Sequence, residues 1–140
     1  MRFKTIAALQ GVAIMGATAL AHLSLRGHEW TWLNTLGAVI VATSFPLWLA
    51  ARIQLGGSFS VRAKAKQLVT HGIYSKIRNP IYIFGTATVA GFVLLINRPV
   101  LLLLLLLLVP MQVARARKEA KVLEEAFGVA YREYRRKTWF

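Results

Sequence analysis

Residues 99–113 read PVLLLLLLLLVPMQV, a run with eight consecutive leucines and no charged side chain. Such a run is typical of a helix in contact with bilayer hydrocarbon, because a soluble domain would leave much of it exposed to water. Of the chain's 140 residues, 56% are hydrophobic, and most of them are gathered into four blocks. The sequence therefore predicts one all-α domain, residues 1–140, that is an integral membrane bundle of about four transmembrane helices. The predicted spans are about 5–25, 32–51, 80–97 and 99–114.

The last two predicted spans form a tight hairpin. Asn97 and Arg98 supply a polar tip, and Pro99 suits the start of a new helix better than the continuation of the previous one. The first block follows Arg2 and Lys4, as the apolar region of a secretory signal peptide would. Its apolar run is too long for that region, which favours a membrane span.

The placement of lysine and arginine predicts the orientation. The formal net charge is +13, and nearly all basic residues precede the first span, lie between the second and third spans, or follow residue 113. Only Arg26 and Arg98 fall in the other two loops. Because positive residues mark cytoplasmic loops, we expect a multi-pass protein of the cell membrane with both termini in the cytoplasm. Anionic lipid beside these segments accounts for the charge, so we expect no nucleic-acid partner.

The chain contains no cysteine, which excludes disulfides, thiolate metal sites and cysteine nucleophiles. We expect no metal site.

Two polar segments remain outside the predicted spans and the short loops, residues 54–82 and 115–140. In residues 115–136, apolar side chains recur at steps of three and four, which predicts an amphipathic helical segment on the cytoplasmic side. A basic helix of this kind commonly lies on the membrane surface as a stabiliser. Gly128 is expected to bend or divide it.

Taken one at a time, the polar residues have simple interpretations. His71 fits an ordinary loop residue. Asn79 and Pro80 are typical of a helix start, and Glu119 fits the ion-pair partner of Arg115 one helical turn earlier. None of these residues alone predicts an enzyme.

Their order along the chain carries more information. The segments are LGGSFS (55–60), LVTHGIY (68–74), RNPIY (78–82) and, after the hairpin, a C-terminal group consisting of Arg115, Glu119, Leu123 and FGVAYREY (127–134). Over about residues 55–137 the chain resembles the isoprenylcysteine carboxyl methyltransferase family and its wider group of membrane phospholipid methyltransferases. It departs from the family pattern at Asn79, where members commonly have histidine, and at Ala120, where they often have a second glutamate.

The resemblance implies an S-adenosyl-L-methionine-dependent methyltransferase that acts at the cytoplasmic face on a lipophilic acceptor. An isoprenylcysteine-type carboxylate and a lipid head group both stay open as acceptors. Arg78 and Glu119 are the implied catalytic residues. The implied cofactor-binding residues are His71, Gly72, Tyr74, Asn79, Pro80, Tyr82, Arg115, Glu119, Leu123, Tyr131 and Tyr134.

The residue types suit the parts of this cofactor. An arginine, Arg78 or Arg115, can hold the methionine carboxylate through two parallel hydrogen bonds. Tyrosine rings can face the sulfonium cation, and Glu119 can accept from the amino group or the ribose. We expect Arg78, Tyr82 and Glu119 to converge, because the hairpin returns the chain to the same membrane face. We further expect residues 115–134 to close over the cofactor as a lid hinged at Gly128.

Two other classes of protein stay open. One is a non-enzymatic membrane module whose basic helix binds anionic lipid or a partner protein. The other is a small transporter or channel subunit, which the near absence of ionisable residues inside the spans disfavours. A homodimer through small residues such as Gly11, Gly16 and Ala17 is also open.

Overall fold

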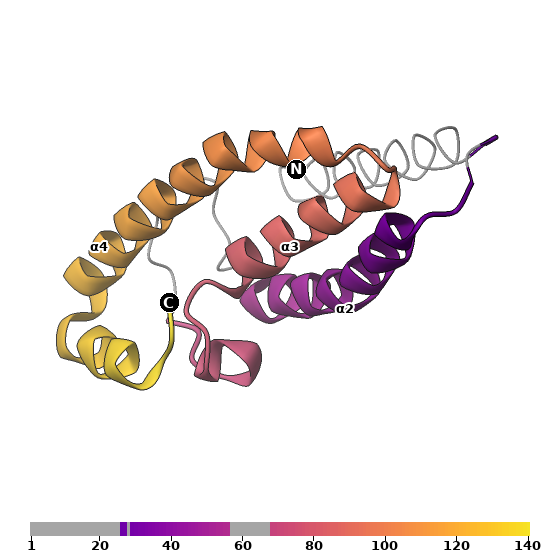
Figure 1. Ribbon diagram of the computed structural model, residues 1–140. Coiled ribbons are helices and arrows are strands. Elements are labelled where there is room, and N and C mark those ends of the chain that lie inside the picture. The colour runs from indigo at the N-terminus through magenta and orange to yellow at the C-terminus, as the bar shows by residue number, and fades with distance from the viewer. Residues whose placement is uncertain (1–25, 28, 57–67) are drawn as a thin grey trace, which may run out of the picture.

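The computed structural model describes residues 26–27, 29–56 and 68–140 (Figure 1). The predicted span 5–25 and most of the LGGSFS segment lie outside the described residues. The elements are α2 (Trp32–Leu55), the short 3-10 helix η2 (Gly72–Ser75), α3 (Pro80–Leu95), the 3-10 helix η3 (Pro99–Leu104) and α4 (Leu105–Lys137). This part of the chain is all-helical, apart from one isolated bridge between Ile77 and Trp139.

Two stretches are long and apolar enough to cross a membrane by length and composition, namely α2 and the combined helix Pro99–Lys137. Helix α3 is equally apolar but shorter. On α4, Leu106 and Leu107 are 74% and 68% exposed. Large apolar side chains exposed in this way suit a helix surface that faces lipid, where their exposure has no hydrophobic cost.

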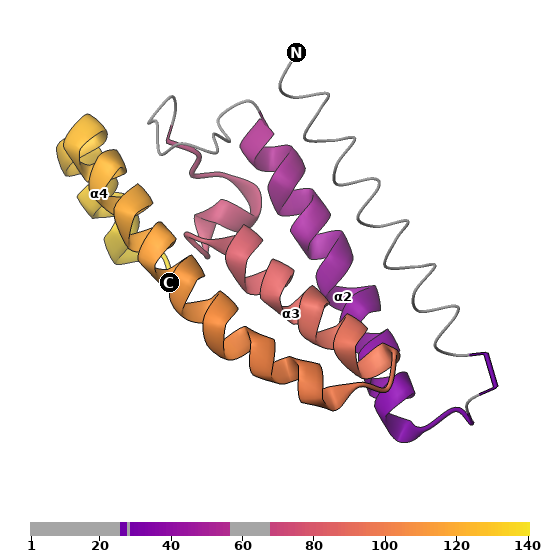
Figure 2. The ribbon, with the colours of Figure 1, turned by 90° about the horizontal axis from the view of Figure 1, so that it is seen from above.

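Helices α2 and α3 run antiparallel in close contact, and Figure 2 shows α3 between α2 and α4. A Cβ atom on Gly37 would lie 2.6 Å from the carbonyl oxygen of Gly91, and one on Gly91 would lie 2.9 Å from methyl groups of Ile40 and Val41. Only glycine permits this approach of the two backbones, as in other tightly packed membrane helices. At one end of the pair, the buried Asn34 donates its amide hydrogen to the carbonyl oxygen of Leu95 at 2.7 Å.

The predicted hairpin between α3 and α4 is present. Helix α3 ends at Leu95, and the chain turns through Asn97, whose φ of 55° is one that asparagine tolerates better than most residues. Pro99 then begins η3. The polar tip and the proline therefore lie where the sequence predicted them.

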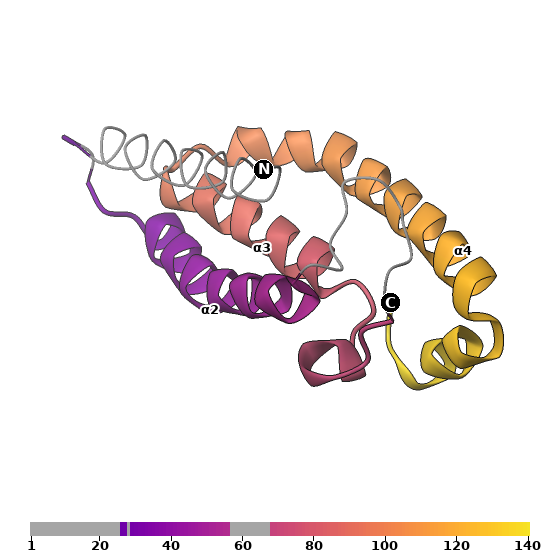
Figure 3. The same ribbon diagram turned by 180° about the vertical axis from the view of Figure 1, so that it is seen from behind.

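Helix α4 differs from the prediction at its middle. No break marks the expected boundary between a span ending at 114 and a separate segment 115–136, because residues 111–127 contain neither glycine nor proline and are rich in helix formers. The helix is interrupted only at Gly128, with φ 50° and ψ −115°, where a bend was expected. After Gly128 the chain folds back, and the last residues lie beside the segment that precedes α3 (Figure 3).

A small buried cluster lies at the end of the molecule where α2 ends and α3 begins. It consists of Ala51, Val69 and Tyr74, with Leu55, Ile73 and Ile81 packed against it. We call this end of the helices the basic end, because among the described residues it carries Arg52 in the last turn of α2 and Lys76 and Arg78 just before α3. The candidate site residues surround this cluster.

Candidate functional site

The connection between α2 and α3 is fixed by a glutamine that the sequence did not single out. The Oε1 atom of Gln54 accepts a hydrogen bond from the backbone N–H of Ile73 at 2.8 Å. Gly72 has φ +60°, and a Cβ atom there would lie 2.6 Å from Cδ of Gln54. Glycine is therefore required at position 72 both by the backbone conformation and by the glutamine that lies against it. His71, the residue before it, is exposed.

Tyr82 and Glu119 meet across the seam between α3 and α4. The Tyr82 hydroxyl donates to Oε1 of Glu119 at 2.7 Å, and Nε of Arg115 donates to the same oxygen at 3.1 Å. One turn further along α3, Thr86 donates to Oε1 of Gln112 at 2.7 Å. The hairpin thus joins two side chains that are 37 positions apart in the sequence, as predicted for Tyr82 and Glu119.

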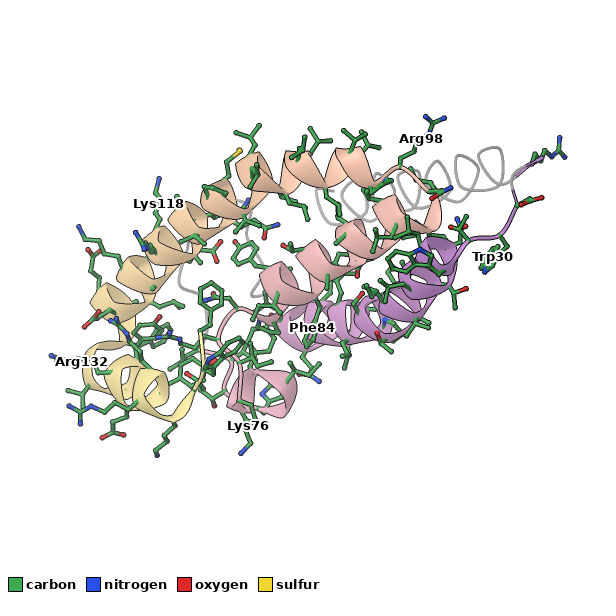
Figure 4. All side chains as sticks on the ribbon, in the orientation of Figure 1. Trp30, Lys76, Phe84, Arg98, Lys118 and Arg132 are labelled. Atoms are coloured by element: carbon green, nitrogen blue, oxygen red, sulfur yellow. The ribbon has the colours of Figure 1, made fainter. Side chains whose placement is uncertain are left out.

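Glu119 keeps one oxygen for other partners. Both hydrogen bonds go to Oε1, and no described residue contributes a hydrogen bond to Oε2. The Glu119 side chain is 30% exposed, so Oε2 is accessible. On α4, Lys118 and Arg132 point away from the molecule, as does Lys76 before α3 (Figure 4), so these charges do not converge on Glu119. Leu123, one turn beyond Glu119, is half-buried.

A second group forms where the segment after Gly128 folds back. Tyr74, Tyr131 and Tyr134 are all buried, and the Tyr134 hydroxyl donates to the backbone carbonyl oxygen of Tyr74 at 2.8 Å. Burial and, to a smaller extent, the repulsive influence of Tyr131 raise the pKa of Tyr134 to about 12, while the charge of Arg78 opposes the rise. Burial also raises the pKa of Tyr131, again opposed first by Arg78. The positive charge of Arg78 therefore acts on both tyrosines.

Arg78 is partly buried, and one of its side-chain donors lacks a partner among the described residues. Its Nε atom is buried and has no hydrogen-bond partner among the residues that the structure describes. An unpaired buried donor on a charged group is costly, and such a group in a folded protein calls for a partner. A carboxylate is the ligand that a guanidinium binds best.

Tyr74 links the two groups. Burial raises its pKa, and the remaining influences on it come from Tyr134, Arg52, Glu119 and Tyr82. Tyr74 therefore responds electrostatically to Tyr82 and Glu119 on one hand, and is hydrogen-bonded to Tyr134 on the other. The sequence did not single out Arg52, near the end of α2, as a site residue. A single arginine after a span is also expected from membrane topology alone.

The start of α3 has an arrangement that the sequence did not predict. Asn79 occupies the N-cap position and Pro80 the first turn, as expected, but the Asn79 side chain makes no cap hydrogen bond. Its Nδ2 atom donates instead to the main-chain oxygen of Phe140 at 3.2 Å. Residues 138–140 lie against residues 76–79 through main-chain hydrogen bonds. No side-chain pattern in Thr138, Trp139 and Phe140 signals this contact.

The site therefore offers a partly buried guanidinium, a partly exposed carboxylate with one oxygen that no described residue binds, and several tyrosine rings. These groups suit a ligand that carries both a carboxylate and a cation. The sequence model of a protein family described as "PEMT: Phospholipid methyltransferase" matches residues 30–130, most of the chain. No curated protein matches the chain, and no solved structure matches it.

Proposed function

We propose that this chain, which belongs to the phospholipid methyltransferase family, transfers a methyl group from S-adenosyl-L-methionine to a lipophilic acceptor at the cytoplasmic face of a membrane. The observation that carries the proposal is the pairing of Tyr82 with Glu119, together with the Nε atom of Arg78, which is buried without a hydrogen-bond partner among the described residues. The acceptor is either an isoprenylcysteine-type carboxylate or a lipid head group.

The residues present fit this cofactor. Arg78 would hold its carboxylate, because no described residue forms a hydrogen bond with the buried Nε atom and a guanidinium offers parallel N–H donors. Oε2 of Glu119 would accept from the amino group or the ribose, while Tyr82 and Arg115 hold Oε1 in place. Tyrosine rings near Tyr74 would face the sulfonium.

When bound, S-adenosyl-L-methionine supplies a methyl group already activated by its positive sulfur. The chain's residues then have to orient the acceptor in line with that group and exclude water. Tyr131 and Tyr134, held by the fold-back at Gly128, would exclude water as parts of a lid. An acceptor carboxylate attacks without a base, whereas an acceptor amine gives up a proton that Oε2 of Glu119 can take.

We also propose a multi-pass topology in which the basic end and both termini face the cytoplasm. Support comes from the excess of Lys and Arg at this end and from the apolar helices of a membrane family. Reporter domains fused to either end of the chain test this. An external C-terminus would contradict the proposed position of the site.

Isothermal titration with S-adenosylhomocysteine, the demethylated product, tests the function. The purified chain in nanodiscs should bind it saturably. Glu119→Gln and Arg78→Gln should each weaken binding about tenfold or more, since a hydrogen bond to a charged group contributes about 1.5–3 kcal/mol. The control is Glu124→Gln, because Glu124 lies on the same helix and pairs only loosely with Arg135 at 3.9 Å. Absence of saturable binding, or equal weakening by the control, would contradict the proposal.

One observation favours a second candidate, a membrane module that binds anionic lipid. Arg135, Arg136 and Lys137 follow one another in the last turn of α4 and are exposed. The module would bind vesicles of phosphatidylserine but would show no saturable site for S-adenosylhomocysteine. The same titration therefore separates the two candidates.

A further inference from the structure

We call the last three residues the strap (Thr138–Phe140); its backbone is extended at Thr138, whereas Phe140 has φ 41°. Thr138 leaves α4 with φ −120° and ψ 147°, and the strap then runs parallel to residues 76–79 (Figure 1). The N–H of Trp139 donates to the Lys76 carbonyl oxygen at 2.7 Å, and the N–H of Arg78 donates to the Trp139 carbonyl oxygen at 3.1 Å. The oxygen of Phe140 accepts from both the backbone N–H and the side-chain amide of Asn79, at 3.1 and 3.2 Å.

We infer that the strap is a positioning element that holds Arg78 and Asn79 in the geometry the cofactor needs. The inference rests on the proposed function. It concerns residues beyond the part of the chain that the family model matches, which ends at residue 130. The strap contacts the site through hydrogen bonds to Arg78 and Asn79, and through the Thr138 hydroxyl, which donates to the Tyr134 carbonyl oxygen at 2.8 Å. Its residues are therefore positioning residues and not catalytic ones.

The strap determines which of two hydrogen bonds the Asn79 side chain makes, one to the strap or one that caps α3. Asparagine is one of the best N-cap residues, and its side chain normally accepts a hydrogen bond from an N–H in the first turn of the helix. Here that bond is not made, and the side chain reaches the strap instead. Without the strap, Asn79 is free to cap α3, and such a cap contributes about 1 kcal/mol. That change would rotate the main chain that carries Arg78.

Arg78 is held on both sides by this arrangement. Its backbone N–H is bonded to the strap, and its charge acts on Tyr131 and Tyr134, which lie on the helix that leads into the strap. Nε of Arg78 has no hydrogen-bond partner among the described residues, so the main chain that carries the side chain has a large part in setting its direction. Loss of the strap would lower the fraction of molecules with a binding-competent Arg78, and the apparent affinity falls in proportion to that fraction.

Main-chain atoms of the strap make these contacts. The Trp139 side chain is 68% exposed and the Phe140 side chain 38% exposed, so neither is held in a core. Removal of the Trp139 side chain should therefore be tolerated, whereas removal of the Trp139 N–H should not. This difference provides a matched pair of variants at one position.

The test compares Trp139→Pro with Trp139→Ala in nanodiscs. Trp139→Pro loses the N–H that bonds to Lys76, and Trp139→Ala keeps it. Hydrogen exchange without ligand should show the Arg78 and Asn79 amides losing protection at least tenfold in the proline variant. Titration with S-adenosylhomocysteine should show an affinity about tenfold weaker in the same variant, and the alanine variant should stay within about twofold of the parent in both measurements.

A third variant covers the case in which proline disturbs folding. Trp139→Gly keeps the N–H and differs from Trp139→Ala in giving the backbone more freedom. The loss of amide protection and the loss of affinity should therefore both appear, but smaller than in the proline variant, at several-fold each. If the parent binds the product and the proline variant binds it equally well despite lost protection, the strap is structural only and the inference fails. If the parent itself shows no saturable binding, the proposed function fails and the inference with it, although the exchange result still reports the strap contact. Equal loss of affinity in the alanine variant would assign the effect to the indole ring and would also overturn the inference.

Discussion

Removing the Tyr82 hydroxyl should loosen the contact between α3 and α4 by a measurable amount. The hydroxyl donates to Oε1 of Glu119 at 2.7 Å. A hydrogen bond to a charged group contributes about 1.5–3 kcal/mol, but the Glu119 side chain is 30% exposed and still pairs with Arg115, so the low end of that range applies. We therefore expect Tyr82→Phe to lower the free energy of unfolding by about 1.5 kcal/mol.

A double-mutant cycle isolates this contact. Tyr82→Phe, Glu119→Gln and the double variant are unfolded reversibly with SDS in mixed micelles, and the coupling free energy between the two positions should be about 1 kcal/mol. Tyr131→Phe is the control for loss of a hydroxyl from a buried tyrosine, because Tyr131 is 3% exposed and its hydroxyl is not among the buried groups that lack a partner. Coupling below about 0.3 kcal/mol would lie within the error of simple additivity and would refute the pairing.

Three further predictions concern the fold-back after Gly128. Tyr134→Phe leaves the buried carbonyl oxygen of Tyr74 unpaired and should cost about 1–3 kcal/mol in the same micelle titration, so an unchanged stability would contradict the bond at 2.8 Å. Gly128→Ala should destabilise by about 1–3 kcal/mol, because φ 50° with ψ −115° strains any other residue, whereas a stabilised variant would indicate a straight helix there. Alkaline titration followed by tyrosinate absorbance should show Tyr134 ionising near pH 12 instead of 10.0. Since the pKa of Tyr134 is higher in the folded state, the protonated tyrosine makes its full contribution to stability below pH 10, and this contribution is lost as the pH rises toward 12. A titration midpoint at pH 10 would contradict the burial of this hydroxyl.

The hairpin and the meeting of Tyr82 with Glu119 could be predicted from the sequence for a physical reason. Proline and a polar tip fix where the chain reverses direction between two apolar helices. The lengths of the helices then determine which residues of the two lie at the same depth along the helix axes. The bend at Gly128 had the same basis, because a glycine in an amphipathic helix is a local signal. Each of these features depends on the type of side chain at one position, or on the spacing of apolar side chains along one helix.

The strap and the Gln54 contact could not be predicted in this way. The strap is built from main-chain hydrogen bonds, which Trp139 makes without use of its indole, so no residue pattern encodes them. Gln54 lies at the end of an apolar helix, where a polar residue is expected in any case, and its bond to Ile73 depends on a loop conformation. The unbroken course of α4 past residue 114 was missed because hydropathy falls there while helix propensity does not.

Transfer of an isotopically labelled methyl group is the most direct test of the central claim. Membranes containing the chain are incubated with S-adenosyl-L-methionine labelled in its methyl group, and lipid-soluble molecules and membrane proteins are then analysed by mass spectrometry, beside membranes containing Glu119→Gln. We expect label in a lipophilic product that depends on the chain and falls strongly with Glu119→Gln. Label that appears equally without the chain, or no label in any lipid-soluble or membrane-protein fraction, would contradict a membrane methyltransferase.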